Sequence, residues 1–411
     1  KEALIAAYLN ETTLYVKSAY LTALGKLDVR ENLEFFKNRL LEVKNQQVPA
    51  EEQKHQGEEI RELNEIILKT EGAKKHQFTG FQMPHEMLLL TNREQREVTL
   101  SEVKEIGASE LHPLGVLVFS KEVTPFTKLR TYRELLFPIH TNERIPAMPH
   151  RAAELLWHSD LYAFLTECHE GDAPFFFRLE VKSAEPKTEF VKKLGASLEK
   201  KSDWKLANST TDYEIEIRLI EAKDGSFVPF LKLYSMKMKR FAYRKNAIAM
   251  SIHPATAAML MYLAKPYLKE NAQILDPCCG VGTMLIERDI LVPAREKYGI
   301  DIFGDAIDMA RENAALAGEK INFIHRDYFD FKHDYKFDEI VTNMPVKGKK
   351  AKEDMDAFYA RFFEKSKSLL AEDGIIIMYS NEVGFVKKQL RLQPCYRLIQ
   401  EYTIRKKDSY C

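Results

Sequence analysis

The 411-residue sequence contains little glycine (17 residues) and little proline (16), which excludes collagen-like and low-complexity chains. Its five cysteines, two of them adjacent at Cys278 and Cys279, give neither an even disulfide set nor the spacing of metal ligands. This cysteine content favours a reducing, cytoplasmic compartment and predicts no metal site. No run of about 18 apolar residues is present, so we expect no membrane association. Because the sequence begins at Lys1 and not at methionine, we expect the natural N-terminus to lie upstream.

The chain also lacks an excess of charge of either sign, since 61 lysines and arginines balance 61 aspartates and glutamates. A protein with this balance that binds a polyanion must gather its positive charge in local patches. Hydrophobic residues make up 45% and charged residues 30%, as in folded proteins. The length predicts more than one domain.

Three regions with different hydrophobic patterns follow one another. In residues 1–80 apolar residues recur every three or four positions, which predicts helices, either plain amphipathic ones or a HEAT-like pair. Residues 84–236 mix short strands and helices, as in an α+β module. Residues 245–411 alternate strand and helix regularly, which predicts an α/β domain with a parallel sheet.

The middle region is predicted in more detail. Strands are expected at 87–90, 115–119 and 175–181, helices at 100–106, 129–137, 152–168 and 189–198, and a hairpin at 213–220 and 228–234.

A glycine turn follows the first strand of the third region. Gly280 and Gly282 allow positive φ and leave bare backbone for a ligand, and the helix that begins near Thr283 offers free N–H groups. About twenty residues later a second strand ends at Asp301, the position of a carboxylate that binds a ribose diol.

These motifs resemble those of class I S-adenosylmethionine-dependent methyltransferases over about 245–411. The resemblance implies S-adenosylmethionine as cofactor and a site made of Asp276, Cys278, Gly280, Gly282, Thr283, Asp301, Ile302 and Asp327. An NAD-binding Rossmann domain is the alternative, but the third glycine of that fingerprint is missing.

A further strand ends in Asn343-Met344-Pro345-Val346, which resembles the tetrad of amino-methyltransferases. An exocyclic base amine is a poor nucleophile, so two acceptors must hold its hydrogens and aim its lone pair at the methyl group. Asn343 and a backbone carbonyl of Met344 or Pro345 suit that task. Val346 departs from the tetrad because an aromatic residue there usually stacks on the base, and Tyr243, Phe358 and Tyr359 are candidates to replace it.

The middle region resembles the ferredoxin-like and THUMP modules of RNA guanine-N2 methyltransferases. Two basic clusters agree with an RNA-contacting surface, although lysine-rich faces are often only solvated. One cluster is formed by Lys192, Lys193, Lys200, Lys201 and Lys205. The residues expected to bind RNA are Lys237, Lys239, Arg240, Tyr243, Arg244 and Lys245, with Lys347, Lys349 and Lys350 after the tetrad.

The sequence therefore predicts a cytoplasmic enzyme that methylates the exocyclic amine of a guanosine, with tRNA as the expected partner. Alternatives are guanine-N2 methylation of ribosomal RNA, adenine amino-methylation of DNA, or an RNA-binding protein whose methyltransferase domain has decayed. The modified position and the oligomeric state are not specified by the sequence. A last strand is expected at 396–405, followed by either a vestigial partner strand or a continuation of the chain.

Overall fold

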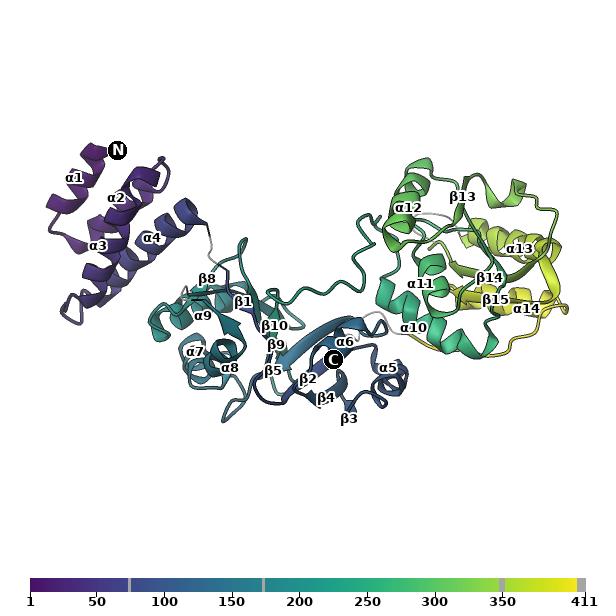
Figure 1. Ribbon diagram of the computed structural model, residues 1–411, viewed down its shortest axis with the longest axis horizontal. Coiled ribbons are helices and arrows are strands. Elements are labelled where there is room, and N and C mark those ends of the chain that lie inside the picture. The colour runs from purple at the N-terminus through teal and green to yellow at the C-terminus, as the bar shows by residue number, and fades with distance from the viewer. Residues whose placement is uncertain (73–74, 172–173, 347–351, 405–411) are drawn as a thin grey trace. The chain divides into compact units, whose positions relative to one another are not determined.

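The computed structural model describes residues 1–72, 75–171, 174–346 and 352–404 (Figure 1). The chain forms two compact units, each made of two separate stretches of sequence. The first unit comprises Lys1–Gln82 and Pro138–Met236, and the second comprises Met83–Phe137 and Lys237–Cys411. No helix among the described residues is long and apolar enough to cross a membrane.

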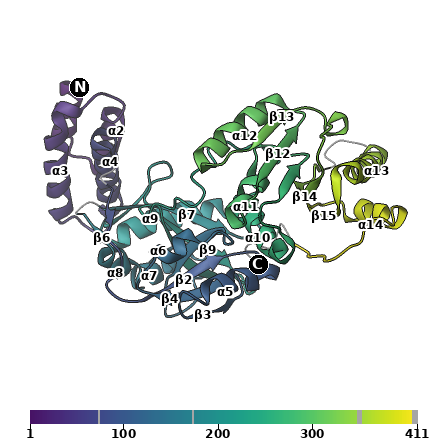
Figure 2. The same cartoon turned by 45° about the vertical axis from the view of Figure 1, so that its right-hand side comes forward.

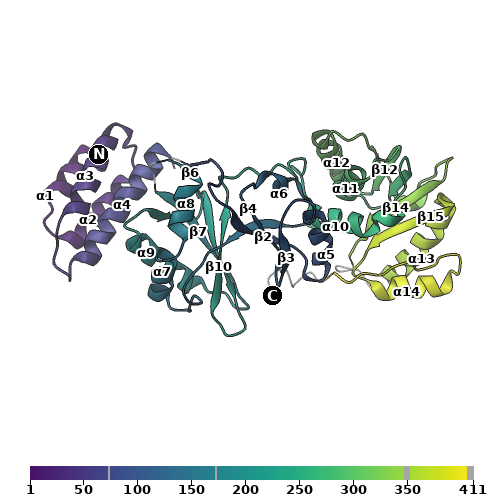
Figure 3. The same ribbon diagram turned by 60° about the horizontal axis from the view of Figure 1, so that its bottom comes forward.

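The first stretch of the first unit is helical, as predicted. Its helices lie side by side (Figure 3). They share one apolar core that includes Tyr8, Leu21, Phe36 and Leu63, all fully buried. The helices are α1 (Glu2–Asn10), α2 (Leu14–Leu24), α3 (Leu33–Asn45) and α4 (Gln53–Glu71).

The second stretch of this unit is a mixed sheet with the strand order β10-β9-β7-β8. The predicted hairpin is confirmed as an antiparallel β9–β10 pair, and β7 lies parallel to both β9 and β8. Its elements are α7 (Pro149–Trp157), α8 (Leu161–Glu167), β7 (Phe175–Lys182), α9 (Thr188–Lys201), β8 (Leu206–Asn208), β9 (Ile215–Glu221) and β10 (Phe227–Leu233). The same unit also contains a separate antiparallel pair of two short strands, β1 (Gln77–Phe78) and β6 (His169–Glu170).

The single helix predicted over 152–168 is wrong, because the chain breaks between α7 and α8. Ser159 Oγ donates to the Leu156 carbonyl at 2.6 Å and accepts from the Leu161 N–H at 3.2 Å, so its side chain replaces helical backbone bonds. Asp160 accepts from the backbone N–H of His140 at 2.8 Å, which fixes the turn from outside the helix.

Residues 83–137 open the second unit with an antiparallel sheet of order β3-β4-β2-β5. The helix predicted over 129–137 is wrong, since Leu135 and Leu136 are buried in β5 and pair with β2. Short apolar runs are compatible with either state until a partner strand is present. The elements are β2 (His85–Leu90), α5 (Arg96–Val103), β3 (Ser109–His112), β4 (Gly115–Ser120), α6 (Thr124–Lys128) and β5 (Glu134–Pro138).

The predicted parallel sheet is present in the second stretch of this unit, with the order β13-β12-β11-β14-β15 (Figure 2). The strand order reverses direction at β11, and ligands bind beyond the carboxyl ends of strands at such a switch point. The strands are β11 (Gln273–Asp276), β12 (Glu296–Asp301), β13 (Asn322–His325), β14 (Phe337–Asn343) and β15 (Leu370–Tyr379). The helices are α10 (Pro254–Ala264), α11 (Thr283–Leu291), α12 (Gly304–Ala317), α13 (Lys352–Leu369) and α14 (Val383–Leu392).

The strand predicted over 396–405 is wrong for the part that the structure describes, since 396–404 pairs with no strand. This segment is held by single bonds instead, from Tyr396 Oη to the Phe363 carbonyl at 2.8 Å and from Gln95 Nε2 to the Thr403 carbonyl at 3.2 Å. Alternating apolar residues suit a strand, but a strand also needs a neighbour with which to form a ladder.

One ion pair in the second unit joins α11 to β14. Arg288 and Glu339 are both fully buried, with two hydrogen bonds of 2.8 and 2.7 Å between guanidinium and carboxylate. The backbone of Lys269 bonds to both members of the pair: its N–H donates to the Glu339 carboxylate and its carbonyl accepts from the Arg288 guanidinium, both at 2.8 Å.

We expect Glu339→Ala to lower the free energy of unfolding by about 3–5 kcal/mol, because it leaves the Arg288 charge buried and unpaired. The double variant Arg288→Met with Glu339→Leu should lose much less, since no charge is then left in the core. Urea titration followed by circular dichroism measures both. Equal losses in the single and double variants would contradict the assignment.

Candidate functional site

The predicted glycine turn lies directly after β11. Gly280 and Gly282 have φ of 50° and 82°, the left-handed region that favours glycine. A Cβ on Gly282 would lie 2.9 Å from the ring of Phe323, whereas a Cβ on Gly280 would meet nothing within 4 Å. Bare backbone therefore faces open space at Gly280, immediately before the N-terminus of α11.

Polar atoms gather at the carboxyl ends of the central strands. Asp276 Oδ1 accepts from the Cys278 N–H at 3.1 Å. Asp276 Oδ2, Thr283 Oγ1 and Thr342 Oγ1 are buried and have no hydrogen-bond partner among the described residues. Burial raises the pKa of the Asp276 carboxyl to about 7, although the Cys278 N–H opposes that shift. The sequence analysis singled out Asp276 and Thr283 but missed Thr342, one residue before the tetrad.

Asp301 lies on the neighbouring strand and faces the same turn. Its Oδ2 accepts from the Gly280 N–H at 2.8 Å and its Oδ1 from the Phe303 N–H at 3.0 Å. The next two side chains, Ile302 and Phe303, are 56% and 64% exposed. Apolar side chains so exposed beside a carboxylate suit an aromatic ligand that carries hydroxyl groups. Only Ile302 was predicted, although the adjacent apolar pair is visible in the sequence.

Asp327 follows β13, the next strand of the sheet. It is exposed, and its Oδ1 accepts from the Phe329 N–H at 2.9 Å. β12 and β13 pair in parallel with Asp301 opposite His325, so Asp327 lies at the same edge as Asp301. The structure thus brings the three predicted cofactor motifs to one edge of one sheet.

The predicted tetrad begins at the end of β14. Asn343 is half-buried, and its Nδ2 lies 3.5 Å from the Met250 carbonyl oxygen. Met344 is only 2% exposed, and its N–H donates to the Tyr379 carbonyl at 2.9 Å, so its side chain anchors the turn in the core. Pro345 and Val346 are half-buried. Lys347, Lys349 and Lys350 lie outside the described residues.

Two of the three residues predicted to stack on a base are buried in the protein interior. Tyr359 is fully buried and its hydroxyl lies 2.6 Å from Ser380 Oγ. Tyr243 is 5% exposed and its hydroxyl donates to Glu287 at 2.5 Å. Phe358 is half-buried on α13 and contacts the ring of Phe329 edge to face, with centroids 5.6 Å apart.

The second basic cluster is not a uniform surface patch. Arg240 donates to the carbonyls of Leu129, Tyr132 and Arg133 at 3.0, 2.5 and 2.6 Å. Its guanidinium also lies 3.7 Å from the centre of the Tyr132 ring. Arg240 thus bonds to residues 129–133 and Tyr243 to Glu287, so the polar atoms of both side chains already have partners within the second unit.

The remaining members of this cluster differ in their surroundings. Arg244 is half-buried and its Nη2 lies 3.4 Å from the Ile252 carbonyl. Lys245 is exposed and pairs with Glu312 at 2.5 Å. Lys237 and Lys239 are exposed and stay candidates for RNA contact. Across the described ranges, no group of three histidine, cysteine or carboxylate side chains is placed to hold a metal ion.

The buried Asp276 carboxyl makes stability depend on pH. The folded protein keeps a proton that the unfolded chain releases above about pH 4, so the free energy of unfolding should fall as the pH rises from about 4 to 7. Asp276→Asn should remove that fall while still accepting from the Cys278 N–H. Urea unfolding at several pH values measures it, with Asp305→Asn on the exposed face of α12 as control. Parallel curves for Asp276→Asn and the parent would contradict the prediction.

Comparison with known proteins gives an independent view of this domain. Residues 242–407 match the family model described as RMKL-like, methyltransferase domain (UPF0020). The chain is 33% identical over 131 residues to a tRNA (guanine(10)-N2)-dimethyltransferase of Methanothermobacter thermautotrophicus, covering 31% of this chain and 38% of that protein. It is 26% identical over 192 residues to the bovine U6 snRNA (guanine-N(2))-methyltransferase THUMPD2, covering 46% and 36%.

Further matches include a protein methyltransferase and a solved structure. A ribosomal protein L11 methyltransferase of Thermotoga petrophila is 25% identical over 196 residues, covering 44% of this chain and 64% of that protein. The chain thus spans less than two thirds of the length of each of these curated relatives. The crystal structure of TrmN from Thermus thermophilus aligns with a TM-score of 0.52 at 19% identity, covering 74% of this chain and 91% of that one.

The fold class predicted for the C-terminal region is confirmed by these matches and by the parallel sheet. Residues 242–407 thus form a domain that matches the RMKL-like (UPF0020) methyltransferase model, and its cofactor is S-adenosylmethionine.

Proposed function

We propose that this protein is an RNA methyltransferase that transfers a methyl group to the exocyclic N2 amine of a guanosine, with tRNA as its substrate. The observation that carries the proposal is the position of Asn343-Met344-Pro345 at the carboxyl end of β14, next to the glycine turn that follows β11. Two relatives whose names specify guanine-N2 methylation of RNA support it.

The described residues fit S-adenosylmethionine. Open space before Gly280 leaves room for the cofactor against bare backbone, and the half-buried Asp301 presents a carboxylate for the ribose hydroxyls. Ile302 and Phe303 offer apolar surface for the adenine ring, and Asp327 an acceptor for its amine. When bound, the cofactor supplies an electrophilic methyl group on a sulfonium.

The chain's own contribution to the reaction is orientation. The amide oxygen of Asn343 and a backbone carbonyl of the tetrad accept the two amine hydrogens and direct the nitrogen lone pair towards the methyl group. Met344 fixes this turn, because its buried side chain and its bond to Tyr379 hold the backbone in place. The aminium product is strongly acidic, so its proton can leave to water after transfer.

A second candidate substrate is an amine of a ribosomal protein, favoured by the match to L11 methyltransferases. The same acceptors would orient a protein amine. Ribosomal RNA and DNA adenine are further substrates with an exocyclic amine. Lys237 and Lys239 are exposed near the start of the catalytic stretch and suit contact with phosphates in any nucleic acid.

One experiment separates these substrates. The full chain is incubated with S-adenosylmethionine carrying a tritiated methyl group and, in separate reactions, with unmodified tRNA, ribosomal RNA, ribosomal proteins or duplex DNA. Nucleoside mass spectrometry should find N2-methylguanosine in tRNA. Label in protein alone, or in adenine, would overturn the proposal and identify the other substrate.

Asp301→Ala should weaken S-adenosylmethionine binding by about 1.5–3 kcal/mol, because it removes charge-assisted hydrogen bonds to the ribose. Isothermal titration calorimetry measures this affinity. Asp308→Ala, on the exposed face of α12, serves as the matched control and should bind normally. Equal affinity in both variants would place the ribose elsewhere.

Asn343→Ala should slow single-turnover methylation by roughly a hundredfold or more, since it removes one preorganised acceptor, while cofactor affinity stays nearly unchanged. Quench-flow with labelled cofactor gives the rate, and calorimetry gives the affinity. Asn322→Ala, at the exposed start of β13, is the control. Near-normal turnover by Asn343→Ala would refute the role assigned to the tetrad.

A further inference from the structure

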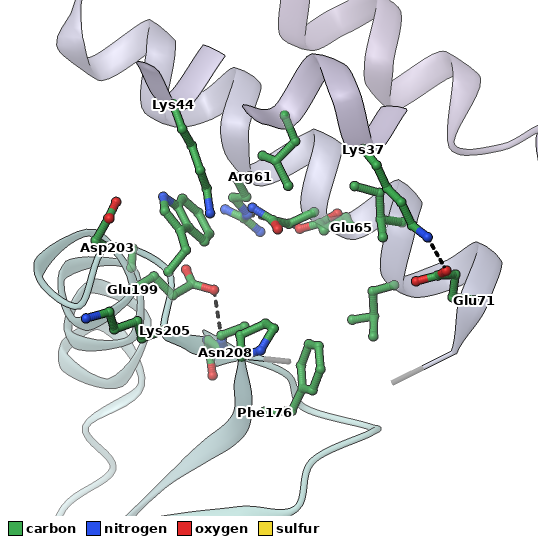
Figure 4. Close-up of a pocket in the computed structure, with 18 of the residues that line it drawn as sticks. Lys37, Lys44, Arg61, Glu65, Glu71, Phe176, Glu199, Asp203, Lys205 and Asn208 are labelled. Atoms are coloured by element: carbon green, nitrogen blue, oxygen red, sulfur yellow. Dashed lines mark hydrogen bonds and ion pairs between the residues drawn. The ribbon is translucent and has the colours of Figure 1, made fainter. Parts of the chain in front are cut away.

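A cavity lies in the first unit, which contains none of the residues of the methyltransferase site. It has a volume of about 710 Å³ and is bounded by α3 and α4 on one side and by α9, β7 and β8 on the other (Figure 4). Cavities that bind small organic ligands have volumes of about 300–1,000 Å³.

The backbone at one wall of this cavity is strained. Asp203 and Trp204 have φ of 49° and 60°, a region that side chains other than glycine rarely adopt. Hydrogen bonds hold this conformation, since the Trp204 N–H donates to the Glu199 carbonyl at 3.0 Å. The indole is half-buried, packs beside the core of the helices and lines the cavity. Strain that places one aromatic ring at a cavity wall is typical of ligand sites.

Two lysines that line the cavity, one on each side of it, have no ion-pair partner among the described residues. Lys44 is half-buried, and it makes no hydrogen bond or ion pair with any residue that the structure describes. Burial lowers the pKa of its amine, and Asp203 opposes that shift only through its charge. Lys192, on α9, is exposed and is also without a described ion pair.

Two other lysines at this cavity have partners for their charged amines. Lys37 pairs with Glu71 at 2.6 Å (Figure 4) and, in an ion pair outside that view, with Glu34 at 3.2 Å. The Lys205 amine lies 5.4 Å from the centre of the Tyr162 ring, a cation–π distance. Lys44 and Lys192 therefore stand out as cations that can accept an external anion.

We infer that this cavity binds one nucleotide, with its base stacked on Trp204 and its phosphate held by Lys44 and Lys192. An aromatic ring and cations without an ion-pair partner, in one cavity, recognise a π-face joined to an anion, and a nucleotide combines the two in a single unit. This chemistry is shared by a free nucleotide and by an unpaired nucleotide of an RNA chain. The inference does not depend on guanine-N2 activity.

Tryptophan fluorescence tests the inference without interference from the methyltransferase site. The chain has two tryptophans, Trp157 and Trp204, and both lie in the first unit. In full-length Trp157→Phe, Trp204 is the only reporter. It is titrated with adenosine monophosphate, with a five-nucleotide single-stranded oligoribonucleotide, and with inorganic phosphate.

We expect saturable quenching that Lys44→Ala weakens about tenfold and Lys192→Ala also weakens. Lys193→Ala is the matched control, because it lies on the same helix, pairs with Glu189 and does not line the cavity. In calorimetry, Trp204→Leu should weaken binding about 5- to 150-fold, the loss of one base stack. If Trp204→Leu does not fold, the binding measured for the two lysine variants still tests the inference.

Quenching by both ligands would identify a site open to free nucleotides, and quenching by the oligonucleotide alone would identify an RNA contact. If neither adenosine monophosphate nor the oligonucleotide quenches the fluorescence, the inference is overturned. Quenching that inorganic phosphate alone reproduces, or that Lys44→Ala and Lys192→Ala leave unchanged, would also overturn it. Methylation assays on the same variants report separately on the proposed function, so the two ideas can fail independently.

Discussion

The buried ion pair between Arg288 and Glu339 couples the two elements on which the catalytic geometry depends. Arg288 lies in the helix that begins at the glycine turn, and Glu339 lies in the strand that ends at Asn343. Two hydrogen bonds between fully buried groups fix the distance between that helix and that strand. Because methyl transfer requires nucleophile and methyl group to be aligned closely, a shift here would move the cofactor relative to its acceptor.

Several arginines in this chain serve the interior rather than a ligand. Arg130 donates twice to Glu287, at 2.8 and 2.7 Å, and once to the Arg240 carbonyl at 2.7 Å. Arg240 in turn caps three backbone carbonyls between 129 and 133. This network joins the antiparallel sheet of residues 83–137 to the methyltransferase stretch. The second unit accordingly contains both stretches, whereas the sequence analysis placed residues 84–236 in one module.

The lysines at the cavity of the first unit differ in whether their amines have a partner. Of the four lysines that line the cavity, Lys37 has a carboxylate and Lys205 a ring as partner, whereas Lys44 and Lys192 have neither among the described residues. A half-buried amine without an ion-pair partner keeps an electrostatic preference for an anion at that place. The charge balance of the whole sequence conceals such a site, since it sums over positions that are far apart in space.

The sequence by itself determined the parallel sheet, the glycine turn and the positions of Asp276, Asp301, Asp327 and Asn343. These follow from local patterns, because the carboxyl ends of parallel strands must meet at one edge. Tertiary structure alone decided which basic and aromatic residues reach solvent. Arg240 bonds to carbonyls more than 100 residues away, and Tyr243 to Glu287, so no local pattern separates them from Lys237 and Lys239. The same holds for β5 and for 396–404, since a strand exists only where a partner strand provides its hydrogen bonds.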